Sequence, residues 1–75
     1  MRKLPPNTIE MLFELRRVNN GSVRVVAIDP ITRTEVVMIG DIRDGETTLK
    51  RMAGRKLQYV LKKKLEEAEA RHKKR

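Results

Sequence analysis

The chain has 75 residues, a formal net charge of +8 and no cysteine, which allows one small domain and excludes a disulfide scaffold or a cysteine-ligated zinc site. No apolar run approaches the ~18 residues of a membrane span. The basic start of the chain lacks the apolar region of a secretory signal, so we expect a cytoplasmic protein without membrane contact. At this length the core is expected to be thin.

The first predicted elements are an arm and a strand. Residues 1–8 are expected to form a flexible arm, because Pro5 and Pro6 fit neither a β-ladder nor a helix interior. Over residues 9–18 apolar and polar side chains mostly alternate, which is typical of a half-buried strand.

An Asn-Gly dipeptide at 20–21 follows this strand. It predicts a β-hairpin with a two-residue type I′ turn, since both central positions of that turn need positive φ. The resulting register pairs Phe13 with Ile28 and Leu15 with Val26. These large apolar residues then share one face, which we expect to be the core side.

The second strand is predicted over 23–29, a turn over 30–33 and the third strand over 34–40. Two registers fit the third strand. One pairs Ile28 with Val36, and the other sets Glu35 opposite Ile28. We favour the first, because the second would bring a carboxylate to the core side.

A helix is predicted from Leu49 onward, because apolar residues recur every three or four positions as far as Leu61. Lys64 then falls near the centre of this apolar stripe. We therefore place the folded domain at 9–62, followed at 63–75 by a basic tail that is weakly helical to disordered.

The predicted fold class is α+β, with a three-stranded antiparallel β-meander packed on one C-terminal α-helix (βββα). The core is expected to contain ten apolar residues, namely Phe13, Leu15, Val26, Ile28, Val36, Met38, Leu49, Ala53, Leu57 and Val60.

Three segments of this pattern resemble a small uncharacterised proteobacterial domain family. They are the strand residues 13–18 with the Asn-Gly turn, the Asp-Pro segment 29–36 and the helical residues 49–61. The family has no assigned activity, so the resemblance implies domain boundaries and carries over no functional residue. Arg33 stands where the resemblance leads us to expect Gly in the turn.

Residues suited to catalysis are scarce. The one histidine, His72, lies in the basic tail, and the one serine, Ser22, lies in a turn without a neighbouring base. Asp41, Asp44 and Glu46 form a carboxylate cluster, which we interpret as helix-start electrostatics in preference to a Mg²⁺ or Ca²⁺ site. We expect no enzyme, no cofactor, no metal and no small-molecule substrate.

Charge and apolar surface suggest two kinds of partner. Nine basic and seven acidic side chains leave only +2 on residues 4–61, and the helix carries Arg51, Arg55 and Lys62 close to one line. We interpret this line as a solvated face in preference to a phosphate-contact stripe.

In the favoured register the outer sheet face, away from the helix, carries seven apolar residues where a solvated face would alternate to polar. We therefore predict a non-catalytic interaction domain that forms a homodimer or docks on a protein through this face. The alternative is a nucleic-acid-binding accessory protein that uses the basic helix line and the basic ends of the chain. The seven predicted interface residues are Leu12, Val18, Val23, Val25, Ala27, Val37 and Ile39.

Overall fold

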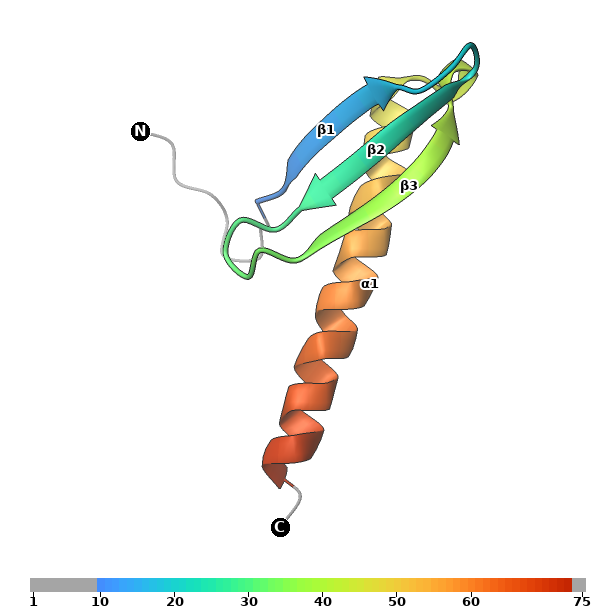
Figure 1. Cartoon of the computed structure of the whole chain (residues 1–75). Coiled ribbons are helices and arrows are strands. Elements are labelled where there is room, and N and C mark those ends of the chain that lie inside the picture. The colour runs from blue at the N-terminus through green and yellow to red at the C-terminus, as the bar shows by residue number, and fades with distance from the viewer. Residues whose placement is uncertain (1–9, 74–75) are drawn as a thin grey trace.

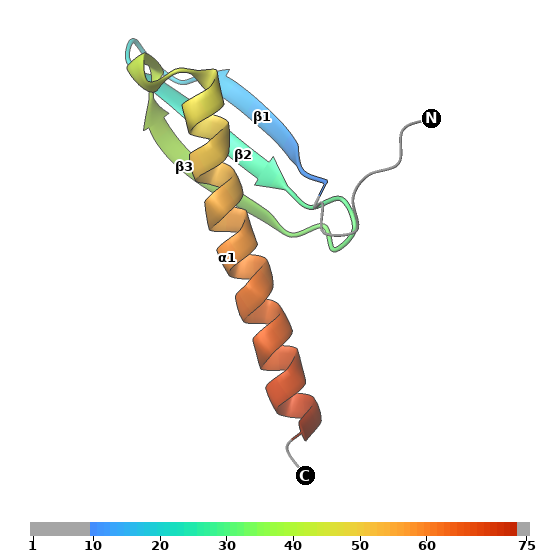
Figure 2. The same cartoon turned by 180° about the vertical axis from the view of Figure 1, so that it is seen from behind.

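The computed structural model describes residues 10–73. Strands β1 (Leu12–Arg17), β2 (Ser22–Ile28) and β3 (Glu35–Asp41) form one antiparallel sheet in the order β1-β2-β3. A 3₁₀ turn, η1 (Ile42–Asp44), leads into the helix α1 (Glu46–Lys73). The predicted βββα fold is confirmed, and Figures 1 and 2 show the helix across one face of the sheet. The predicted arm at 1–8 and residues 74–75 lie outside the described residues.

The first hairpin has a different turn from the predicted one. The backbone N–H of Val18 donates to the carbonyl of Ser22 at 3.0 Å, so the loop has three residues, 19–21. The side-chain oxygen of Asn19 accepts from the N–H groups of Gly21 and Ser22 at 3.3 and 3.2 Å. Because Asn19 closes the loop, the predicted two-residue type I′ turn is wrong.

The longer loop shifts the strand register by one residue. Phe13 pairs with Ala27, and Leu15 pairs with Val25. A shift of one residue turns every side chain of β2 to the other face. Val26, predicted in the core, therefore lies on the face away from the helix.

The favoured register of the third strand is also wrong. Ile28 pairs with Glu35, and Val26 pairs with Val37. The predicted objection to this register was a carboxylate in the core, but β2 is turned over and Ile28 points outward. Glu35 opposite it is exposed, so the register has no burial cost.

The turn between β2 and β3 is organised by Asp29. Its backbone N–H donates to the carbonyl of Thr34, and its carbonyl accepts from Arg33, both at 2.8 Å. Its carboxylate accepts from the hydroxyl of Thr32 at 2.6 Å and from the N–H of Thr32 at 3.2 Å. These hydrogen bonds, with the Thr32 hydroxyl first, hold the pKa of Asp29 below its ordinary value of 3.8. Arg33 has φ 63°, which explains why Gly was expected there.

The core lies between the sheet and α1. It consists of Val23, Val25, Ala27 and Val36 from the sheet and Leu49, Ala53 and Leu57 from the helix. Partly buried apolar residues flank it, namely Met11, Phe13, Leu15, Met38, Ile42, Val60 and Leu61. Eight of the ten predicted core residues are therefore in or against this core. Val26 is also buried, at 4% exposed, but on the face away from the helix, and Ile28 points outward beside it.

The helix extends beyond the sheet. Val60 and Leu61 still pack against the core, and the Lys64 ammonium donates to the Thr34 hydroxyl at 3.2 Å. The residues from 62 to 72 are exposed, yet the helix continues to Lys73. This stretch consists largely of Lys, Glu, Leu and Ala, which favour helix in water. The tail that we expected to be weakly helical to disordered is therefore helical as far as residue 73.

Candidate interaction surfaces

Two members of the carboxylate cluster, Asp41 and Glu46, have structural partners. The Asp41 carboxylate accepts from the N–H of Arg43 at 2.8 Å and forms an ion pair with the Arg43 guanidinium at 2.8 Å, which lowers the pKa of Asp41. Glu46 forms an ion pair with Lys50 at 2.8 Å. Within residues 10–73, no group of three or more His, Cys, Asp or Glu is arranged to hold a metal ion.

His72 and Ser22, the two residues considered for catalysis, lie far apart in the chain and at different elements. His72 is exposed in the last turn of α1, and Ser22 begins β2. In the part of the chain that the structure describes, no helix combines the length and apolar character of a membrane span.

We use the term outer face for the sheet side away from α1. From one end of the sheet to the other, its cross-strand rows are Leu12–Ile28–Glu35, Glu14–Val26–Val37 and Arg16–Arg24–Ile39. Five of these nine side chains are apolar. Leu12 is 52% exposed, Val37 38% and Ile39 60%.

The prediction for this face is correct in part. Leu12, Val37 and Ile39 lie on it, and Val18, 54% exposed, follows β1 on the same side. Val23, Val25 and Ala27 were wrongly assigned to it, because the register shift buries them under α1, where they are 7%, 0% and 0% exposed. The sequence reasoning missed the half-buried Ile28 for the same reason, and Val26 also lies on this face but is only 4% exposed.

Two features of the outer face go beyond its apolar content. Arg16 lies directly opposite Arg24, and like charges in cross-strand positions repel. Glu35 occupies the opposite corner of the three rows from Arg16. Acidic and basic groups are therefore separated along the strand direction.

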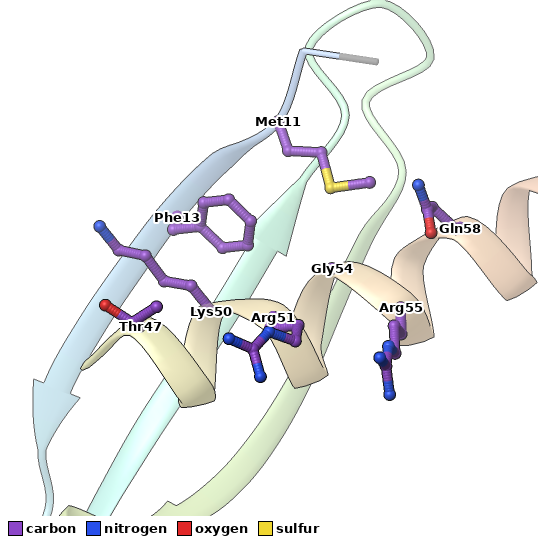
Figure 3. A pocket seen from close by; sticks show the side chains of 8 residues that line it. All are labelled: Met11, Phe13, Thr47, Lys50, Arg51, Gly54, Arg55 and Gln58. Atoms are coloured by element: carbon purple, nitrogen blue, oxygen red, sulfur yellow. The ribbon is translucent and has the colours of Figure 1, made fainter. Parts of the chain in front are cut away.

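A second surface lies on the other side of the sheet, where β1 borders the helix. We call it the β1–α1 groove, a cavity of about 460 Å³ lined by Met11, Phe13, Thr47, Lys50, Arg51, Gly54, Arg55 and Gln58. Figure 3 shows Phe13 of β1, and Met11 just before this strand, extending over Gly54 of the helix. The floor is apolar and the helix side of the groove carries cations.

The structure brings two of the predicted nucleic-acid residues to this groove. Arg51 and Arg55 line it, whereas Lys62 lies further along the exposed helix and does not. The groove itself was not predicted. Its signal in the sequence is Gly54, a residue with poor helix propensity inside a strongly helical segment.

Comparison with known proteins identifies the family. No curated protein and no solved structure matches the chain. The sequence model of the family described as "Domain of unknown function (DUF6898)" matches residues 8–64, more than half of the chain, and covers β1 to β3 and the packed part of α1. The chain therefore belongs to the DUF6898 domain family, an uncharacterised family as the sequence resemblance implied.

Proposed function

We propose that this chain is a non-catalytic interaction domain that forms a homodimer through its outer face. The observation that carries the proposal is the apolar strip on that face, where Leu12, Val37 and Ile39 remain 52%, 38% and 60% exposed. Covering about 400 Å² of apolar surface contributes on the order of 10 kcal/mol before the cost of association. That gain is large for a domain with a thin core.

Charge placement favours a second copy as the occupant of this face. Leu12 and Ile39 lie along one diagonal of the three rows, with the 4% exposed Val26 between them, and Glu35 and Arg16 lie at the two remaining corners. A two-fold axis close to this diagonal stacks the sheets with their strands near right angles, which is a common sheet packing. It also brings Glu35 of each copy within reach of the partner's Arg16.

The cross-strand arginines support the same arrangement. Arg16 and Arg24 repel each other within one chain. A carboxylate from a second copy would offset that repulsion, and the two-fold symmetry supplies it twice. The outer face is therefore self-complementary in both its apolar strip and its charges.

The test is a pair of charge reversals, Glu35→Arg and Arg16→Glu. Each variant alone sets like charges against each other in its own dimer, so we expect each to sediment as a monomer at micromolar concentration. Mixed in equal amounts they restore two opposite-charge pairs, and we expect the mixture to sediment as a dimer. Both residues are exposed, so the fold is expected to persist.

The matched control is Lys63→Glu, a charge reversal on the exposed part of α1 away from the outer face. It should dimerise as the wild type does. A wild type that sediments as an 8.7 kDa monomer at ~100 μM, above typical weak-dimer affinities, contradicts the proposal. So does a mixture of the two reversals that stays monomeric while the wild type dimerises.

Nucleic-acid binding through Arg51, Arg55 and Lys62 gives a different result in the same measurement. Association would then require added nucleic acid and would fall steeply between ~50 and ~200 mM salt. In that case the Arg16→Glu and Glu35→Arg variants would not restore association when they are mixed. The near balance of charge on residues 4–61 is the reason we place the dimer first.

A further inference from the structure

We propose that the β1–α1 groove and the free edge of β1 bind an extended peptide as a fourth strand, and that this peptide carries an apolar side chain flanked by acidic ones. The proposal is separate from the homodimer, because the groove lies on the helix side of the sheet and the dimer uses the outer face. Three observations carry it. They are the open edge of β1, the apolar floor of the groove at Gly54 and the rim of basic side chains along its helix side.

The edge of β1 offers backbone hydrogen bonds. Val18 and Ser22 form a hydrogen-bonded pair, and along β1 such positions alternate with positions that do not bond to β2. Phe13, Leu15 and Arg17 therefore direct their N–H and carbonyl groups away from β2. Within residues 10–73 no further strand pairs with this edge. An added strand would satisfy these groups, as in other cases of β-strand addition.

The opposite edge is less available. On β3, the carbonyl oxygen of Val37 points outward and accepts a hydrogen bond from the Lys56 ammonium at 3.2 Å. A lysine at a sheet edge opposes strand addition. Among residues 10–73 the two edges therefore differ, and β1 is the edge that remains open to a partner.

The floor of the groove is apolar because α1 has a glycine there. Gly54 is buried, and a Cβ at this position would lie 3.5 Å from Met11 Sδ and 3.6 Å from Phe13 Cζ. Met11 and Phe13 are only partly buried. An apolar side chain on the helix side of an added strand would meet these two residues.

The rim selects the charge of the peptide. Lys50, Arg51 and Arg55 line the groove, and none of the eight lining residues is acidic. Lys50 forms an ion pair with Glu46, whereas Arg51 and Arg55 form no ion pair within the described residues. Acidic side chains two positions to either side of the apolar one would point to the same side of the added strand and face these guanidinium groups.

The probe is a fluorescently labelled seven-residue peptide in which Thr alternates with Glu, Leu and Glu at its three even positions. We expect saturable binding to the full chain by fluorescence anisotropy, about tenfold weaker binding when both Glu are replaced by Lys, and slowed hydrogen exchange at the Phe13 and Leu15 amides. Slowed exchange at these amides reports backbone hydrogen bonds to an added strand, which purely electrostatic binding of the peptide would not form.

Two variants locate the site. The double change Arg51→Glu, Arg55→Glu is expected to weaken binding about tenfold or more, and both residues are exposed. The matched control Lys62→Glu, Lys63→Glu makes the same charge change beyond the groove and should leave the affinity within about twofold at 150 mM salt. Gly54→Leu fills the floor and should also weaken binding. If it does not fold, Gly54→Ala, for which there is room, should show a smaller loss.

Four outcomes would overturn the proposal. They are equal binding of the Glu and Lys peptides, equal losses in the groove and control variants, unchanged exchange at Phe13 and Leu15, and no saturable binding at all. Concentration-dependent protection of these two amides without peptide would assign the edge to a second copy. Binding of a duplex DNA oligonucleotide through Arg51 and Arg55, with no peptide binding, would assign the groove to nucleic acid.

Discussion

The backbone of Gly40 on β3 lies against the buried side chain of Leu49 on α1, so closely that a Cβ at residue 40 would overlap Leu49 Cδ2. Leu49 is 1% exposed and has little freedom to move aside. This contact sets how closely the start of the helix approaches the end of β3.

Gly40→Ala is therefore expected to destabilise the domain by about 1–3 kcal/mol, because the added methyl group overpacks the core. Urea unfolding measures the change. Gly54→Ala is the matched control, since its Cβ has ordinary contacts at 3.5 Å or more and a helical Gly costs about 1 kcal/mol relative to Ala. Gly40→Ala is expected to lower the free energy of unfolding and Gly54→Ala to raise it. Equal changes in the two variants would contradict the close contact between Gly40 and Leu49.

The turn at Arg33 leads to a stabilising prediction. A non-glycine residue with φ 63° bears a steric cost that glycine avoids. Arg33→Gly should raise the free energy of unfolding by about 0.5–1 kcal/mol, after the greater freedom of glycine in the unfolded chain is included. Arg33→Ala keeps the cost of positive φ while removing the side chain, so a gain of the same size in Arg33→Ala would rule out the backbone explanation.

Asp29 should make stability depend on acid pH. Its pKa is lowered in the folded state, first by the Thr32 hydroxyl, so its ionised form contributes stability above the unfolded pKa of 3.8. That contribution is lost as the pH falls through the lower folded pKa. The stability difference between the wild type and Asp29→Asn should thus be constant near neutral pH and shrink below about pH 4.

Urea unfolding at a series of pH values measures this difference. Thr32→Val removes the hydroxyl that lowers the pKa of Asp29 most. The folded pKa of Asp29 should then lie closer to its unfolded value, so the stability contributed by Asp29 should be lost over a narrower pH range. A difference that stays constant down to pH 2 would show that the Asp29 carboxylate is not stabilised in the fold.

Lysine substitutions on the two sides of the sheet should have different effects. Val25 is 0% exposed and Ile39 is 60% exposed. Val25→Lys buries a charge under the helix and should unfold the domain. Ile39→Lys should leave the circular dichroism spectrum unchanged and abolish the proposed dimer in sedimentation. A folded Val25→Lys variant would mean that β2 faces the other way.

The order and type of the elements could be predicted because alternation, turn residues and the helical stripe agree. The face assignment of β2 could not. Val23, Val25, Val26, Ala27 and Ile28 are all apolar, so a period of two fits either face. The choice depends on the loop, where the Asn19 carboxamide replaces the expected two-residue turn.

The groove could not be assembled from the sequence for a different reason, although Gly54 marks its floor. It needs Met11 and Phe13 to lie over Gly54, which is about forty positions away in the chain. Local patterns do not report such a separation. The spacing of Arg51 and Arg55 could place them on one helix face, but their apolar neighbour across the groove, Phe13, comes from β1.

The hydrogen bond from Lys56 to the Val37 carbonyl has a consequence for assembly at high concentration. If both edges of the sheet were open, β1 of one molecule could join β3 of the next, and this head-to-tail contact would repeat without end as a fibre. Because a side chain of its own helix binds the Val37 carbonyl, the β3 edge is less open to this pairing. The proposed binding of a strand at β1 therefore fits a sheet whose other edge disfavours head-to-tail polymerisation.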